Sequence, residues 1–248
     1  MCHCEPACGR QAPRNDRGQN MKLSIIIPAH NEQATIQVLI AKVLAVPLGG
    51  WDKEIIAVND GSSDFTGDIL NKLELTHPEL LIISHPKNLG KGAAIKTALK
   101  EAGGDYIIIQ DADGEYDPSD IPLLLGALEE KYRIIFGNRG IKHYPERGFH
   151  YVIGAKLLTW TVNLLFFARL EDLYTGYKLI PAKIMKEINL DSTGFEFEAE
   201  VACKILKQGF KIREVPISYI PRSKVQGKHI RFKDAFIGFW TILKYRIK

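Results

Sequence analysis

Five short apolar runs recur along the first half of this 248-residue chain, and they limit the folds open to it. They are rich in Ile, are bounded by Pro, Asp, Asn or Gly, and span residues 23–27, 54–59, 80–84, 106–110 and 133–137. Helix-compatible segments separate them, near residues 32–46, 65–75, 91–102 and 119–130. Uninterrupted apolar strands that alternate with helices are typical of a parallel sheet covered on both faces. The sequence therefore predicts an α/β domain with a mostly parallel sheet flanked by helices.

Polar and Gly-rich segments follow the first four runs directly. They read PAHNE, NDGSSD, HPKNLGKG and QDADGE in chain order. In open parallel sheets, ligands bind outside the carboxyl ends of the strands. Asp60 is expected to accept a hydrogen bond from a base or ribose, and Lys91 to carry positive charge to phosphates. Gly90 and Gly92 allow a ligand to approach the backbone closely.

The stretch YIIIQDADGEYDP, residues 106–118, places acids at every second position: Asp111, Asp113, Glu115 and Asp117. A calcium-binding EF-hand loop is excluded, because its sixth and twelfth positions need Gly and Glu and are here Tyr and Pro. A solvated turn remains one interpretation. The other is a Mg²⁺ or Mn²⁺ site, in which carboxylates bind a hard cation and a substrate diphosphate completes its shell.

Positive charge collects near the C-terminus, although the formal net charge of the chain is only +4. Residues 207–248 hold eleven Lys and Arg against two acids, which leaves about −5 for the rest. A basic end of this kind favours an anionic partner, such as phosphate groups, a lipid headgroup surface or nucleic acid. A solvated tail is the alternative.

Two segments are amphipathic or apolar enough to touch a membrane. A basic helix is predicted at 229–248, where Phe236, Trp240, Leu243 and Ile247 share one face, either packed on the core or lying at a membrane surface. The apolar stretch 152–168 is interrupted by a Lys and an Asn, so we expect a core or interfacial helix and no membrane span.

The first 20 residues contain almost no large apolar side chain, and we expect a disordered leader. Cys2, Cys4 and Cys8 lie there, but a further pair of ligands at a zinc-site spacing does not follow them. Cys203 falls in a helical pattern and is expected to be a buried thiol. With no visible signal peptide, a reducing, cytoplasmic setting is expected.

Five sequence blocks together resemble the family 2 glycosyltransferases, which have the GT-A (Rossmann-like) fold. They are SIIIPAHNE, AVNDGSSDFT, NLGKGAA, DADGEYDP and FGNR, in this order. The later blocks DLYTGYKLI, GFEFEAEVACKILKQGFKIREVPISY and PRSKVQGKHIRFKDA resemble the branch that contains the polyprenyl-phosphate glycosyltransferases, the dolichyl-phosphate mannosyltransferases among them. The resemblance covers roughly residues 21–246.

This resemblance implies an inverting hexosyltransferase that depends on Mg²⁺ or Mn²⁺. Its donor is a nucleotide-diphosphate sugar of the GDP-mannose or UDP-glucose type, and its acceptor a polyprenyl phosphate, dolichyl or undecaprenyl. The catalytic GT-A domain spans residues 21–228, ahead of the helix at 229–248. We expect a peripheral protein on the cytoplasmic face of a membrane, without a nucleic-acid partner.

The resemblance also assigns roles to individual residues. The nucleotide-sugar site comprises Pro28, His30, Glu32, Asn59, Asp60, Lys91, Asp111, Ala112, Asp113 and Arg139. The metal ligands are Asp111, Asp113 and Glu115. The catalytic residues are Asp111, Asp113 and Asp172, of which the last either acts as a base or orients the acceptor. The residues that hold phosphates or the acceptor are Arg139, Arg222 and Lys228.

Three departures from the family pattern leave alternatives open. His30 replaces a usual Tyr and Asn59 a usual Asp, so the base of the donor is not fixed. The block PRSKVQGKHI weakens an assignment to mannose. A family 2 enzyme acting on a glycan or another hydroxyl acceptor is one alternative. A non-catalytic nucleotide-sugar-binding protein or membrane assembly partner is another.

Overall fold

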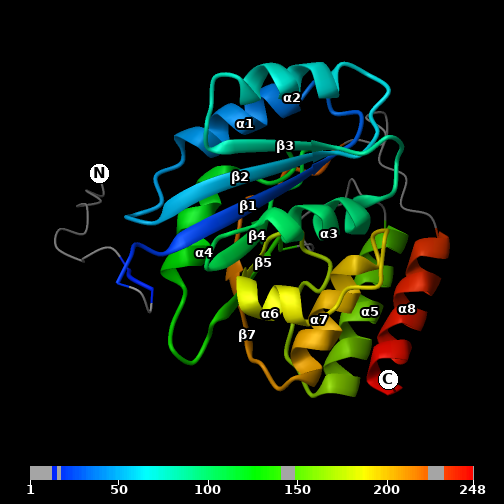
Figure 1. Ribbon diagram of the computed structural model, residues 1–248. Helices are drawn as coiled ribbons and strands as arrows, with labels where there is room; N and C mark the ends of the chain where they lie inside the picture. The colour runs from blue at the N-terminus through cyan, green and yellow to red at the C-terminus, as the bar shows by residue number, and fades with distance from the viewer. Residues whose placement is uncertain (1–12, 16–17, 141–148, 223–231, 248) are drawn as a thin grey trace, which may run out of the picture.

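The computed structural model describes residues 13–15, 18–140, 149–222 and 232–247, and its centre is a seven-stranded sheet (Figure 1). The strand order is β3-β2-β1-β4-β6-β5-β7. The strands are β1 (Lys22–Ala29), β2 (Asp52–Asn59), β3 (Leu80–Ser84), β4 (Tyr106–Ile109), β5 (Ile134–Asn138), β6 (Lys178–Pro181) and β7 (Ile212–Pro216).

The predicted mostly parallel sheet is confirmed. β1 pairs in parallel with β2 and β4, β2 with β3, and β5 with β7. β6 runs antiparallel to both of its neighbours, β4 and β5. The five predicted apolar runs therefore all point the same way, and their carboxyl ends meet at one edge of the sheet.

Helices cover both faces of this sheet. They are α1 (Ile36–Ala45), α2 (Thr66–Glu74), α3 (Lys91–Glu101), α4 (Ile121–Gly126), α5 (Phe149–Phe166), α6 (Ala182–Glu187), α7 (Phe197–Lys207) and α8 (Phe232–Ile247), with a 3₁₀ turn η1 (Pro118–Asp120) before α4. The helix expected at 119–130 ends early, at Gly126. Residues 127–130 instead form turns, and Glu129 pairs with Tyr132 in a short antiparallel bridge.

Alternate side chains of the central strands enter two separate cores. Ile25, Ile27 and Ile55 pack with α1, α2 and α4 on one face. Ile26 and Ile56 pack with α3, α5, α6, α7 and α8 on the other. Burial on both faces is the reason that these strands contain uninterrupted apolar runs.

Cys203 lies inside α7 and is fully buried, as expected. Burial raises the pKa of its thiol to about 12, because the charged thiolate is poorly solvated there.

The C-terminal helix packs on the core, but not through the predicted face. Ile242 and Tyr245 are buried, whereas Phe236, Trp240 and Ile247 are exposed. α5 is likewise a surface-covering helix of the second core. Within the part of the chain that the structure describes, no helix is both long and apolar enough to cross a membrane.

Part of the predicted leader is described. Arg14 and Asn20 form an isolated antiparallel bridge, and the Met21 amide donates to the Pro13 carbonyl oxygen. Cys2, Cys4 and Cys8 lie outside the described residues, so the disordered leader stays a prediction.

Candidate active site

The loops after β2 and β3 are held together by one buried carboxylate, Asp60. It accepts hydrogen bonds from the amides of Leu89 (2.9 Å) and Gly90 (2.8 Å) and contacts His85 Nδ1 at 2.7 Å. Burial opposes ionisation of Asp60, but these hydrogen bonds outweigh it and lower its pKa. Asp60 therefore fixes the position of the NLGKG loop, whose Lys91 begins α3.

A chain of alternating charges runs inward from the end of β4. Lys91 Nζ lies 2.6 Å from Asp111 Oδ1 and 2.9 Å from Glu198 Oε1, and Glu198 also contacts Lys178 Nζ. Burial opposes the charge on Lys91, but Asp111 and Glu198 overcome it and raise its pKa. Lys91 thus remains cationic beside the carboxylate that the sequence predicts to bind metal.

Arg222 fastens the DADGE loop to the segment after β1. Its Nε donates to the Asp113 carbonyl oxygen (2.7 Å), and its two terminal nitrogens donate to the Glu32 carboxylate at 3.0 and 2.5 Å. Glu115 is buried and accepts from the Arg222 amide (2.9 Å) and the Tyr219 hydroxyl (2.6 Å). Residues 113–115 therefore form one connected unit with the segment that ends at Arg222.

A buried ion pair closes the site beyond β5. Arg139 donates to both Asp172 oxygens, from Nε at 2.7 Å and from a terminal nitrogen at 2.6 Å. The Asp172 amide in turn donates to Glu214 Oε1 (2.8 Å). Burial is the main reason that the pKa of Glu214 is raised. Such bidentate geometry fixes the orientation of both the guanidinium and the carboxylate.

The residues at the end of β4 suit a hard divalent cation in their chemistry. Asp111 and Asp113 offer carboxylate oxygens, and Asp111 is partly exposed. Gly176 lies against Asp111, where an added Cβ would come within 2.6 Å of Oδ2, so the glycine keeps this carboxylate accessible. No group of three His, Cys, Asp or Glu side chains forms a metal cluster among the described residues. A two-carboxylate site completed by water and phosphate oxygens is a usual arrangement for Mg²⁺.

A family model now decides the classification. The model described as glycosyl transferase family 2 matches residues 24–187, about two thirds of the chain. The chain belongs to glycosyl transferase family 2. The resemblance drawn from the sequence blocks is thereby confirmed.

Two relatives within this family show moderate identity. The polyprenol monophosphomannose synthase of Mycolicibacterium smegmatis is 26% identical over 235 residues, which cover 88% of this chain and 86% of that protein. The dolichol-phosphate mannosyltransferase of Pyrococcus furiosus is 27% identical over 218 residues, covering 85% of this chain but only 61% of that protein.

Solved glycosyltransferase structures share the fold. Glucosyl-3-phosphoglycerate synthase from Mycobacterium tuberculosis, solved with UDP, superposes with a TM-score of 0.70 at 19% identity, covering 91% of this chain and 80% of that one. The same enzyme has been solved with Mn²⁺, UDP-glucose and phosphoglyceric acid, and with Mg²⁺ and UDP. The predicted GT-A fold is confirmed.

The structure brings most of the predicted site residues of this family 2 protein to one edge of the sheet. Pro28 is the penultimate residue of β1 and Asn59 is the last residue of β2. His30 contacts the Asp60 carbonyl oxygen, and the buried Ala112 lies between the two predicted metal ligands in the sequence. Lys228 lies outside the described residues. Nucleotide, metal and acceptor contacts of all these residues stay predictions.

Sequence reasoning missed the residues that support the site from behind. Glu198 and Lys178 are buried, and Glu198 binds both Lys178 and Lys91. The half-buried Glu214 accepts a hydrogen bond from the Asp172 amide. The acids inside the apolar block GFEFEAE could have predicted the buried Glu198, because a buried carboxylate needs a cationic or hydrogen-bonding partner.

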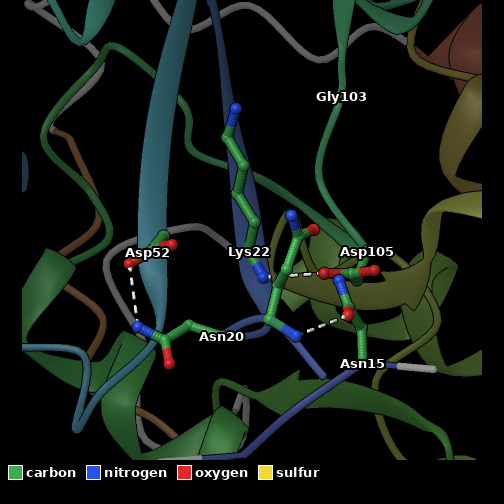
Figure 2. Close-up of a pocket in the computed structure, with 7 residues that line it drawn as sticks. Asn15, Asn20, Lys22, Asp52, Gly103 and Asp105 are labelled. Atoms are coloured by element: carbon green, nitrogen blue, oxygen red, sulfur yellow. Dashed lines mark hydrogen bonds between the residues drawn. The ribbon is translucent and has the colours of Figure 1, made fainter. Parts of the chain in front are cut away.

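A separate cavity of about 570 Å³ lies at the opposite ends of the strands (Figure 2). Lys22 and Asp52 begin β1 and β2, and Asp105 immediately precedes β4. Asn20 donates to Asp52 at 3.4 Å, and the Lys22 amide to Asp105 at 2.8 Å. This cavity is therefore remote from the predicted metal ligands and belongs to no part of the candidate active site.

Proposed function

We propose that this chain is an inverting hexosyltransferase that moves a sugar from a nucleotide-diphosphate sugar to a polyprenyl phosphate, using Mg²⁺ or Mn²⁺. The observation that carries the proposal is that two groups of charged side chains lie at the same edge of the sheet. One is the carboxylate pair Asp111 and Asp113, and the other is the buried Arg139–Asp172 pair. The relatives named as polyprenol and dolichol mannose transferases support the acceptor class.

Asp111 and Asp113 would hold the metal, which neutralises charge on the departing diphosphate when it is bound. Lys91 contacts Asp111 already, so an ammonium group stands beside the place proposed for that diphosphate. The buried Glu198 keeps Lys91 there whether or not Asp111 turns toward a cation. Glu115 supports the loop through Tyr219 and Arg222, in addition to the ligand role predicted for it.

The state of Asp172 favours an orienting role over that of a general base. Both of its oxygens already accept hydrogen bonds from Arg139, a group that never gives up its proton. A phosphate monoester is ionised near neutral pH, so its attack on the sugar does not require a strong base. Arg139, held by Asp172, would instead present its charge to a phosphate.

The donor is proposed to be of the GDP-mannose or UDP-glucose type, bound by the loops after β1 and β2. The setting is proposed to be the cytoplasmic face of a membrane, where a polyprenyl phosphate presents its headgroup. The basic residues near the C-terminus suit such an anionic surface.

The test combines purified full-length protein, Mg²⁺ or Mn²⁺, a panel of GDP- and UDP-sugars and a polyprenyl phosphate. We expect a glycolipid product from at least one donor and none in the presence of a chelator. Asp113→Asn should abolish metal-dependent turnover. Asp117→Asn is the matched control, because Asp117 caps η1 through the Ser119 amide and lies in the same acidic stretch. Transfer to a soluble glycan instead, or equal activity of both variants, would contradict the proposal.

A further inference from the structure

The structure points to a docking surface for a lipid bilayer, built from α5 and α8 on the second face of the sheet. Here we propose that these two helices rest on a bilayer that contains anionic phospholipids. The inference rests on the proposed function, since a lipid-linked acceptor requires an enzyme positioned at its membrane. It adds the surface and orientation by which that enzyme docks.

Large apolar side chains on both helices face solvent. On α5 and just beyond it, those that are more than half exposed are Leu157, Trp160, Leu164 and Phe167. On α8 they are Phe236, Trp240 and Ile247. Each set repeats at intervals of three, four or seven residues and so follows one side of its helix. The opposite sides are used by the core, through Leu158 and Val162 on α5 and Ile242 on α8.

The two stripes lie on neighbouring helices that run in the same direction (Figure 1). A Cβ added at Gly238 of α8 would come within 3.3 Å of Leu158 in α5, and Arg246 near the end of α8 lies over the Phe166 ring at the end of α5. Exposed apolar side chains on paired helices are a surface that a soluble domain rarely leaves uncovered.

The most exposed of these side chains is held in an unfavourable backbone conformation. Phe167 is 89% exposed and has a φ of 54°, in the left-handed region that bulky residues avoid. The folded protein therefore keeps an unfavourable backbone conformation at a residue whose phenyl ring is exposed to solvent. A bilayer interface gives such a ring an apolar environment.

The charge of these helices favours anionic lipid over another apolar protein surface. Residues 149–170 and 232–247 together contain five Lys and Arg, namely Lys156, Arg169, Lys233, Lys244 and Arg246, and one acid, Asp234. Apolar and Trp side chains accompanied by Lys and Arg are the composition of interfacial helices. Cationic groups near an anionic leaflet add attraction that salt screens.

The surface also adjoins the candidate active site. Tyr174, two residues after Asp172, lies against α8, because a Cβ at Gly238 would meet its hydroxyl at 2.1 Å. A bilayer under α5 and α8 would therefore place lipid headgroups beside the segment that carries Asp172.

The test measures binding of the full-length protein to sedimentable vesicles of phosphatidylcholine, with and without phosphatidylglycerol. The anionic lipid makes up about 30% of the total, which gives the vesicles a negative surface potential. The double variant Leu157→Ser/Phe236→Ser should weaken partitioning to anionic vesicles at least about tenfold. Val38→Ser/Leu75→Ser is the matched control: both side chains are as exposed, but they lie on α1 and at the end of α2, on the other face of the sheet, and binding should be unchanged.

Fluorescence provides an independent measurement. The chain has three Trp residues, and a Trp51→Phe background leaves Trp160 and Trp240 as reporters on the proposed surface. Their emission should shift to shorter wavelength on anionic vesicles and be quenched by brominated lipid. An unshifted emission, or equal vesicle binding by the wild type and the Leu157/Phe236 variant, would overturn the docking surface. So would a wild-type dimer that this variant converts to a monomer without loss of vesicle binding, because a second copy would then be the occupant.

A transfer assay with a short-chain polyprenyl phosphate dispersed in detergent separates this inference from the proposed function. Both double variants should retain wild-type turnover there. Vesicle binding without any transfer by the wild type would defeat the proposed function alone. Transfer by a protein that ignores vesicles would defeat the docking surface alone.

Discussion

Replacing Glu198 by Gln tests whether the buried charges behind Asp111 hold the site together. The buried Glu198 lies between two ammonium groups, 2.9 Å from the Nζ of the half-buried Lys91 and in direct contact with the Nζ of the fully buried Lys178. In the variant, Lys91 keeps Asp111, but Lys178 is left beside the neutral carbonyl oxygen of Thr175. Removing one partner of a buried ion pair costs about 3–5 kcal/mol. Because Gln still offers an oxygen, we expect the lower value, about 3 kcal/mol.

Differential scanning calorimetry measures this loss. For a domain of this size, 1 kcal/mol corresponds to about 2–4 °C, so the melting temperature should fall by about 6–12 °C. Glu187→Gln is the control, since Glu187 is exposed on α6 and its replacement should change stability by less than about 0.5 kcal/mol. Adding Lys178→Met to the Glu198 variant should restore part of the loss, because it removes the ammonium group that lost its partner.

The effect should also depend on pH with a defined sign. Burial opposes ionisation of Glu198, but Lys178 and Lys91 outweigh it and lower its pKa below the ordinary 4.5. Its stabilising contribution is therefore complete above pH 4.5 and disappears as the pH falls through the lower folded-state pKa. The difference in melting temperature between the wild type and the Glu198→Gln variant should therefore become smaller as the pH falls below 4.5. A variant that melts within about 2 °C of the wild type at pH 7 would refute the structural role of the cluster.

Two further predictions concern the backbone and the buried thiol. Gly61→Ala should destabilise the protein by about 1–3 kcal/mol or more in urea unfolding, because Gly61 has a φ of 64° and a Cβ would lie 2.2 Å from the Lys87 carbonyl carbon. Gly126→Ala, where a Cβ meets no atom within 4 Å, is the control, and equal stability of the two would contradict the reasoning. In a background with Cys2, Cys4 and Cys8 changed to Ser, Cys203 should resist a thiol reagent at pH 8 and react in denaturant, since its pKa is about 12. Rapid labelling of the folded protein would show that the thiol is accessible.

The strands that the sequence predicted are those whose apolar runs are continuous. β6 and β7 were not predicted from the sequence, and each has a physical reason. β6 has only four residues and begins with the buried Lys178, whose charge is paired with Glu198, a residue distant in the sequence. β7 is half-buried and carries Arg213 and Glu214 at its centre, so it lacks the apolar signal of the central strands.

The same distinction holds for the candidate site. Local motifs identified single residues such as Asp111, Asp60 and Arg139, because each follows the end of a predicted strand. They did not reveal that Arg139 pairs with Asp172, since 33 residues separate the two and only the antiparallel β6 brings that part of the chain back. Likewise, periodicity found the apolar stripe of α8, but the structure was needed to show that the stripe faces solvent.

The central claim is tested most directly by following a labelled sugar from its nucleotide donor into a lipid. Wild-type protein, Mn²⁺, a labelled GDP- or UDP-hexose and a polyprenyl phosphate are incubated, and the organic phase is assayed for labelled glycolipid. We predict a labelled polyprenyl-phosphate sugar whose anomeric configuration is opposite to that of the donor, and no product from the Asp113→Asn variant. A product with retained configuration, or the absence of labelled lipid with every donor while a soluble hydroxyl acceptor is glycosylated, would contradict the claim.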